Sequence, residues 1–260
     1  MIKAIRGWGS LFILASLVSA IAHLPLSVVL NWFTLPDAVQ LRGVNGSLWQ
    51  GRIQQVSWQQ QALGSVEWSL NGWQLFMGRI EAETRFGHGS RLDLKGKGVV
   101  GLSFNGIYIQ NAVISVPMGK MLQLVTLPVP MTVSGMGTLS IKELNTQGWQ
   151  NSVPECANGQ AELVWNAAQA QTPLAPLVLD TVTVHAQCDD GAIHLQGRQE
   201  SAQVQSEFSM QLQQPDKTYS FRGWFKPQAE FPESLHSLLS SLPKPDEQGR
   251  FSIQQHGQWP

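Results

Sequence analysis

Histidines, carboxylates and cysteines are the residues here whose chemistry could build an active site or a metal site. The six histidines stand at positions 23, 88, 185, 194, 236 and 256. None has the HExxH or CxxC spacing that brings several ligands to one zinc ion. The densest group is His185, Asp189, Asp190 and His194 on a predicted hairpin. We interpret that group as a solvated strand face rather than a metal site, so the sequence predicts no metal and no cofactor.

A glycine-rich segment and the serines are the remaining candidates for catalysis. Residues 96–101 (Gly-Lys-Gly-Val-Val-Gly) fit a literal GxGxxG pattern. A dinucleotide site needs a helix after those glycines, because the helix N-terminus binds the phosphates. Here Leu102, Phe104, Ile107 and Ile109 follow at strand-like spacing, and no serine stands in a GxSxG elbow. The sequence therefore predicts no catalytic residue and indicates that the protein is not an enzyme.

Cys156 and Cys188 are the two cysteines, 32 positions apart. Neither belongs to a CxxC motif, which argues against a redox-active role. In an oxidising compartment an even pair predicts a disulfide. Two reduced, buried thiols are the alternative, so the interpretation depends on the compartment.

The N-terminal segment gives that compartment. Residues 7–36 contain no charged side chain, and Lys3 and Arg6 precede them. Residues 11–30 would span about 30 Å as a helix, the thickness of a bilayer core. The positive-inside rule puts residues 1–6 in the cytoplasm, so residues 1–36 form a predicted stub and transmembrane anchor. A signal peptide cleaved near Ala20-Ile21-Ala22 is the alternative, and both interpretations place the rest across a membrane.

Composition excludes other classes of partner. Lys and Arg number 17 against 18 Asp and Glu, giving a net charge of -1, so no basic field attracts nucleic acid. Charged residues make up 13% of the chain, and 28 glutamines and ten tryptophans take much of their place. A hydrophobic fraction of 43% argues against wholesale disorder.

After residue 37 the apolar residues recur every second position. Ile80, Ala82, Thr84 and Phe86 form one face of a predicted strand, and the same alternation runs from Val204 to Leu212 and through Leu92 and Leu94. One apolar and one wet face per strand predicts antiparallel pairing. Two segments alone, 118–127 and 233–242, look helical, each between prolines.

The proline pattern around those helices indicates an internal duplication. Pro117, Pro128 and Pro130 recur 115 positions later as Pro232, Pro243 and Pro245. We predict two similar β-rich repeats, 37–150 and 151–260, each with several strands, one short helix and a closing strand.

A further constellation comprises Gly46, Ser47, Leu48, Trp49, Gly51, Leu63 and Trp68. Gly51 allows another group to approach the backbone closely. Trp58, Trp68 and Trp73 are expected on neighbouring strands, as cross-strand aromatic pairs. On the residues alone this is a packed β corner that implies no chemistry.

This spacing resembles the signature of the type II secretion system protein N family (general secretion pathway protein N). That signature runs Gly-Thr-Leu-Trp-x-Gly, eleven residues, Leu, four residues, Trp, and Ser47 takes the place of its Thr. The resemblance implies a single-pass inner-membrane component, without assigned enzymatic activity, of the machine that exports folded proteins across the Gram-negative outer membrane. Its implied partners are the inner-membrane platform and the periplasmic domains of the secretin.

The fold also resembles AsmA-like β-sheet proteins, whose long curved sheets line an apolar groove. The resulting prediction is an all-β protein with one N-terminal transmembrane helix and a large curved antiparallel sheet. An open sheet of this kind leaves room for an alternative function, periplasmic lipid binding or transfer. A third possibility, an exported enzyme, would require His185, His194 and Asp189 to meet in space.

Overall fold

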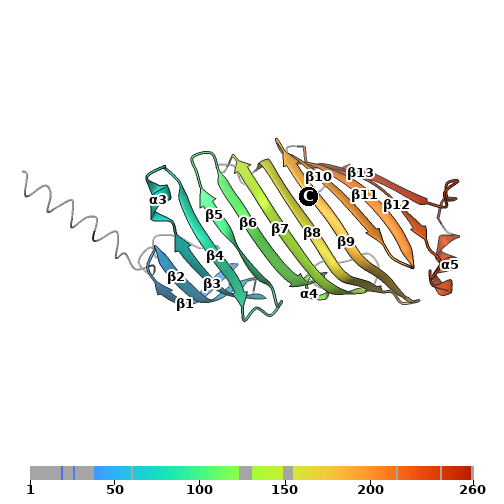
Figure 1. Ribbon diagram of the computed structural model, residues 1–260, viewed down its shortest axis with the longest axis horizontal. Helices are drawn as coiled ribbons and strands as arrows, with labels where there is room; N and C mark the ends of the chain where they lie inside the picture. The colour runs from blue at the N-terminus through green and yellow to red at the C-terminus, as the bar shows by residue number, and fades with distance from the viewer. Residues whose placement is uncertain are drawn as a thin grey trace, which may run out of the picture.

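The computed structural model describes residues 19, 26, 38–59, 61–122, 131–148, 155–214, 216–240 and 242–258. Thirteen strands and three short helices occur among the elements of this part of the chain (Figure 1). The strands are β1 (Val39–Gly46), β2 (Gln50–Trp58), β3 (Gln61–Leu70), β4 (Ile80–His88), β5 (Lys95–Leu102), β6 (Ile107–Pro117), β7 (Thr132–Gln147), β8 (Glu155–Gln171), β9 (Pro176–Asp189), β10 (Ala192–Glu200), β11 (Val204–Gln213), β12 (Thr218–Pro227) and β13 (Phe251–Gln258). The helices are α3 (Gly72–Leu75), α4 (Met118–Leu122) and α5 (Glu233–Leu239).

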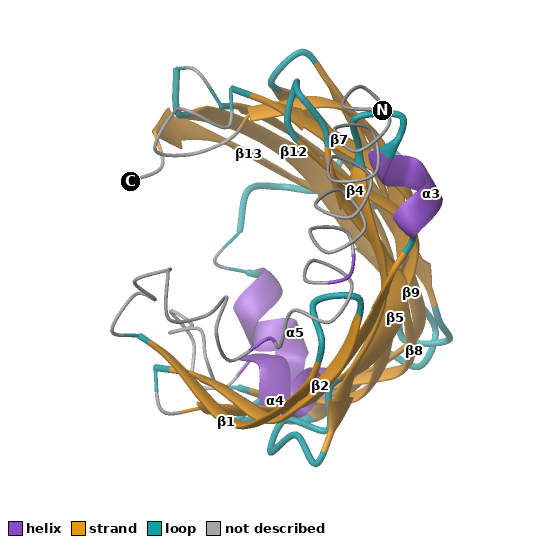
Figure 2. Ribbon diagram, turned by 90° about the vertical axis from the view of Figure 1, so that its left-hand side faces the viewer, coloured by secondary structure: helices purple, strands orange, loops and turns teal. Residues whose placement is uncertain are grey.

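The strands form a single antiparallel sheet whose order follows the sequence from β1 to β13. Each strand therefore pairs with its neighbours along the chain, and β1 and β13 are the two edges. Figure 2 shows the sheet bent into an open trough, with α4 and α5 on the concave side. The prediction of a large, curved, antiparallel all-β sheet is confirmed.

The pairing register separates an apolar face from a polar one. One row of partners crosses all thirteen strands and contains apolar residues and glycine alone: Val44, Ile53, Val66, Phe86, Gly96, Ile114, Leu139, Leu163, Val184, Gly197, Phe208, Gly223 and Ile253. A neighbouring row on the other face is polar except for Val113: Glu67, Arg85, Lys97, Val113, Ser140, Glu162, His185, Gln196, Ser209, Arg222 and Gln254. Successive side chains on a strand point to opposite faces, so a fixed register carries this contrast across the sheet.

The apolar face is the concave one. Gly137 lies two residues before Leu139 on β7 and shares its face. A Cβ atom at Gly137 would lie 2.6 Å from the sulfur of Met118, the first residue of α4. Because α4 lies inside the trough, the apolar row faces inward (Figure 2).

Glycines in the apolar row make room for aromatic rings from the next strand. A Cβ atom at Gly96 would lie 2.4 Å from Cζ of Phe86, and one at Gly197 would lie 2.1 Å from Cε1 of Phe208. Phe208 also stacks on Phe221 of β12, with ring centroids 5.9 Å apart. The rings thus cover backbone that the small residues leave open.

Several expectations from the sequence need correction. The structure adds α3, which follows an Asn71 cap and was not expected. Leu92 and Leu94 lie in the connection between β4 and β5 rather than in a strand. The two expected helices begin where proposed, at Met118 and Glu233, but α5 ends at Leu239 instead of residue 242.

The predicted anchor at residues 1–36 lies outside the described residues, apart from Ser19 and Leu26. In the described part of the chain, no helix has the length and apolarity needed to cross a membrane. The predicted boundary near residue 150 falls between β7 and β8, and these strands pair with each other. The ranges 37–150 and 151–260 therefore contribute strands to one continuous sheet.

Candidate functional site

The turn between β1 and β2 gathers most of the sequence motif. The backbone N–H of Ser47 donates to the carbonyl of Gln50 at 2.9 Å. From β3, the indole Nε1–H of Trp68 donates to the carbonyl of Leu48 at 3.0 Å. The Trp68 side chain is half-buried. Its bond to Leu48 connects the β1–β2 turn to β3, the strand that follows β2 in the sheet.

Two glycines allow that arrangement. Gly51 and Trp68 are direct partners in the β2–β3 register, and a Cβ at Gly51 would lie 2.2 Å from Cζ2 of the Trp68 ring. Gly46 has φ +98°, and a Cβ there would lie 2.5 Å from the carbonyl oxygen of Gln50. Gly51 is thus required because the Trp68 ring lies so close to it, and Gly46 is required because its backbone has a positive φ.

The structure does not bring the whole motif together. Leu63 lies five residues before Trp68 on β3, about 17 Å away along the strand. The expected cross-strand pairing of tryptophans is wrong. Trp58 pairs with Gln61 at the far end of β2, and Trp73 lies in α3 with 70% of its surface exposed. The motif residues other than Leu63 form a structural corner next to the β1 edge, and no motif residue has an ionisable side chain.

The concave face is only partly covered. Its apolar residues are mostly half-buried, and no large side chain among the described residues is fully buried. A pocket of about 290 Å³ opens on this face beside Cys156 and Cys188. Its apolar lining includes Ile141, Leu144, Ala161, Ala186 and Ile193.

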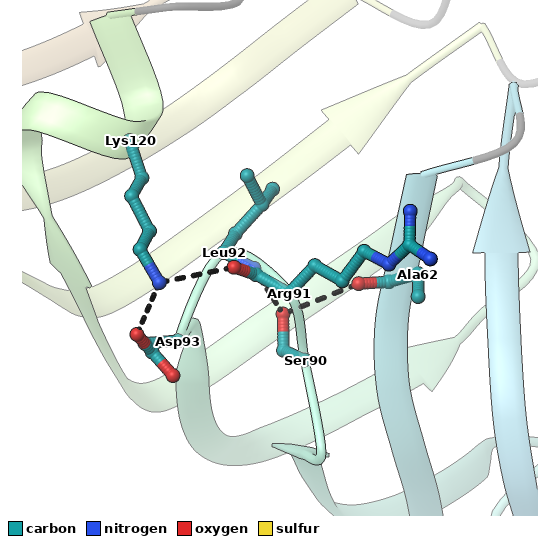
Figure 3. Close-up of polar contacts among 6 residues, drawn as sticks. All are labelled: Ala62, Ser90, Arg91, Leu92, Asp93 and Lys120. Atoms are coloured by element: carbon teal, nitrogen blue, oxygen red, sulfur yellow. Dashed lines mark hydrogen bonds and ion pairs between the residues drawn. The ribbon is translucent and has the colours of Figure 1, made fainter.

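A lysine on α4 ties this helix to the neighbouring connection between β4 and β5 (Figure 3). Lys120 Nζ donates to the carbonyl of Arg91 at 3.1 Å and forms an ion pair with Asp93. The hydrogen bond and the charge of Lys120 hold the pKa of the Asp93 carboxyl below its ordinary value. In the same connection, Ser90 Oγ donates to the carbonyl of Ala62 at 3.4 Å. No sequence pattern indicated this link, because it joins two residues that are 27 positions apart.

The catalytic candidates do not assemble. His185 lies opposite Gln196, and its Nδ1 is 3.6 Å from the Glu162 carboxylate. His194 lies opposite Gln187. Within the described ranges, no three His, Cys, Asp or Glu side chains group as a metal site requires, so His185, His194 and Asp189 are not brought together as ligands. Residues 96–101 lie within β5, in agreement with the strand interpretation.

The two cysteines lie on neighbouring strands, β8 and β9. Their Cα atoms are 6.3 Å apart and the structure has a disulfide between them. Cys156 is 5% exposed, and its backbone N–H donates to Gln214 Oε1 at 2.7 Å. That this bond forms in the cell stays a prediction.

A buried tyrosine on the convex side was not identified from the sequence. Tyr108 is 7% exposed, and its hydroxyl donates to Glu81 Oε2 at 3.0 Å. Burial, followed by the hydrogen bond to Glu81, raises the pKa of the Tyr108 phenol. Its ring covers Gly101, where a Cβ would lie 2.1 Å from Cζ. The Tyr108–Glu81 bond joins β6 to β4, and Tyr108 also lines a pocket together with Met77, Phe104 and Thr146.

Comparison with known proteins assigns most of the chain to a family. A family described as "Type II secretion system (T2SS), protein N" matches residues 37–254. The chain belongs to the type II secretion system protein N family. It is 41% identical to "Type II secretion system protein N" of Vibrio cholerae serotype O1 over 256 residues, covering 98% of this chain and 99% of the relative.

Other members of the type II secretion system protein N family are more distant. The protein of that name from Aeromonas hydrophila is 34% identical over 252 residues, covering 95% of this chain and 96% of the relative. The protein of that name from Klebsiella pneumoniae is 27% identical over 237 residues, covering 87% of this chain and 86% of the relative. No solved structure matches the chain significantly. The resemblance drawn from the motif is confirmed.

Proposed function

We propose that the protein is a non-enzymatic component of the type II secretion system, anchored in the inner membrane by residues 1–36 with its sheet in the periplasm. It would support the export of folded proteins across the outer membrane. The family match over residues 37–254 carries this proposal. The uncharged segment 7–36, preceded by Lys3 and Arg6, supports the anchor and its orientation.

Partners would bind at an edge of the sheet or at the adjacent corner. Arg42 is the single charged residue of β1. An edge strand with few charges and no proline can accept a further strand through its free N–H and C=O groups. The inner-membrane platform and the periplasmic domains of the secretin are the proposed partners.

Deletion of the gene, followed by measurement of released exoprotein, tests the function. We expect folded substrate to accumulate in the periplasm, and complementation with the wild-type gene to restore release. A C-terminal reporter active only in the periplasm tests the orientation. Release that stays unchanged in the deletion strain would exclude a required role in export, and a cytosolic reporter would exclude the topology.

Lipid binding is a second candidate, and the concave face supports it. The apolar row crosses all strands, and its side chains are largely half-buried rather than covered. A trough of this kind can hold acyl chains against half-exposed apolar side chains.

Mass spectrometry of the gently extracted full chain would detect bound lipid. Leu163→Glu on the concave face should remove it, whereas Ser140→Glu on the convex face should not. Absence of lipid from the wild-type protein would exclude this candidate.

We also propose that residues 37–150 and 151–260 arose from one duplicated unit. Helix α4 precedes β7 and helix α5 precedes β13, so each range ends in a short helix and a closing strand. Separate expression of each range, with hydrogen exchange, tests whether each forms its own strands. Failure of both ranges to protect any amide would count against the proposal.

A further inference from the structure

A cluster of exposed apolar side chains projects from one end of the sheet. It comes from α3, the turn that follows it and the turn between β5 and β6. Phe76 and Phe104 are 85% and 86% exposed, far more than the half-buried residues of the trough. We call this cluster the tip patch, and it comprises Trp73, Leu75, Phe76, Met77 and Phe104.

Local structure holds the tip patch in position. Asn71 Oδ1 accepts the backbone N–H of Trp73 at 3.2 Å and so caps α3. The Trp73 and Phe76 rings lie 5.6 Å apart between centroids. Across the gap to the next turn, a Cβ at Gly78 would lie 2.7 Å from Cε2 of Phe104. Two connections that are separate in sequence therefore present one apolar surface.

Two further described turns at the same end of the strands have ordinary polar sequences. The β9–β10 turn carries Asp190 and Gly191, and the β11–β12 turn carries Asp216 and Lys217. Exposed Trp, Phe and Met are not what a solvated turn requires. Among these described turns, the apolar side chains gather in the β1–β6 part of this end.

The charges near the tip patch favour a lipid surface over water. Arg79 is the exposed cation of the turn after α3, and its acidic neighbour at the start of β4, Glu81, accepts hydrogen bonds from Tyr108 and Asn71. No charged residue occurs between positions 98 and 119. Aromatic and other apolar side chains beside a cation match the chemistry of the bilayer interface, where rings sit at headgroup level and cations meet anionic lipid.

We propose that the tip patch inserts into the surface of the same bilayer that residues 7–36 anchor. This inference rests on the proposed anchor. The described chain enters the sheet at β1, and α3 lies at the same end of the long axis of the molecule as β1 (Figure 1). Along the strands, β1 begins at Val39 beside the β2–β3 turn, opposite to α3, so it is a bilayer lying across this end of the long axis that would face Trp73, Phe76 and Phe104. The contact would hold the trough at a fixed orientation to the membrane.

Site-specific fluorescence in vesicles tests the contact. The full chain is reconstituted into vesicles of phosphatidylethanolamine and phosphatidylglycerol with a nitrobenzoxadiazole label on Phe76→Cys or Phe104→Cys. Asp216→Cys, at an exposed turn on the same end of the sheet, is the matched control. The disulfide protects the native cysteines, and labelling of the unmutated chain checks this. Circular dichroism confirms that each variant folds.

Insertion by about 5–10 Å would bring both patch labels within reach of doxyl groups on the lipids. We expect about twofold stronger quenching, with a blue-shifted emission, at positions 76 and 104 than at position 216. Equal quenching at all three positions overturns the inference, as does a blue shift without quenching, which would place the patch against a second protein copy. Flotation and alkaline extraction of the same vesicles report on the anchor separately. A chain that is extracted by alkali refutes the anchor, whereas an anchored chain with unquenched labels refutes the patch contact alone.

Discussion

Substitution of Gly51 by alanine tests the role of the motif corner. A Cβ at this position would lie 2.2 Å from Cζ2 of Trp68 and 3.0 Å from the Asn45 carbonyl oxygen. Carbon atoms at optimal contact are about 3.5–4.0 Å apart, so the ring must move by more than about 1 Å. That movement also breaks the bond from Trp68 Nε1 to Leu48.

The expected cost follows from these two effects. Overpacking of a well-packed contact costs about 1–3 kcal/mol and loss of a hydrogen bond about 1 kcal/mol, so Gly51→Ala should lower the free energy of unfolding by about 2–4 kcal/mol. Urea unfolding of the full chain in detergent micelles, followed by far-UV circular dichroism, measures it. Gly72→Ala is the matched control, because its Cβ would meet only Cζ3 of Trp49 at an ordinary 3.6 Å. That control should be neutral or stabilise α3 by up to about 1 kcal/mol.

A double-mutant cycle identifies the ring as the cause. In a Trp68→Ala background the same Gly51→Ala change should cost less than about 1 kcal/mol, since the crowding atom is gone. An equal cost of Gly51→Ala with and without the Trp68 ring would refute this reasoning. So would a cost for Gly72→Ala that matches the one for Gly51→Ala.

Three further predictions concern a covalent and two electrostatic links. Cys156→Ser should lower the free energy of unfolding by about 3–4 kcal/mol, because the disulfide closes a loop over a sequence separation of 32. Lys120→Met should lower the melting temperature at neutral pH, since the lowered pKa of Asp93 stabilises the fold above about pH 4; this difference should narrow as the pH falls through the folded-state pKa. The phenol of Tyr108 should titrate above its ordinary pKa of about 10 in a spectrophotometric titration, and Glu81→Gln should return the pKa part of the way.

Each of these predictions has a control. Reductant should destabilise the wild-type protein and leave Cys156→Ser unchanged; an equal response of both would exclude the disulfide. Lys142→Met, at an exposed position of β7, should leave melting unaffected at all pH values where Lys120→Met shows a difference. The chain has two tyrosines, so a Tyr219→Phe background isolates the Tyr108 titration. A midpoint at the ordinary value there would contradict its burial against Glu81.

The sheet was predictable because its signal is local. Ile80, Ala82, Thr84 and Phe86 alternate in the sequence, and they share the concave face of β4 in the structure. Antiparallel order between sequence neighbours requires no long-range information beyond this period of two. The same alternation failed at Leu92 and Leu94, because the β4–β5 connection imitates a strand without pairing.

The corner was predictable only in part. Gly51 was expected to admit a close neighbour, and Trp68 supplies it. That a Trp68 indole bonds the Leu48 carbonyl depends on the register of β2 against β3, which contains irregularities that no sequence period reveals. Helix α3 escaped detection because four residues are too few for a helical period, although Asn71 is a suitable cap.

The order of the strands also bears on how the protein acquires its structure. Since β1 to β13 pair strictly in succession, each new hairpin can add to strands already made. The entropic cost of loop closure therefore stays small at every step, as in solenoid proteins, in which each repeat contacts only its neighbours. During synthesis the N-terminal strands are made first. The sheet can therefore assemble strand by strand from β1 onward, before the last residues have been made. Interruption of synthesis after β7 would leave a shorter trough with a new open edge rather than an unfinished core.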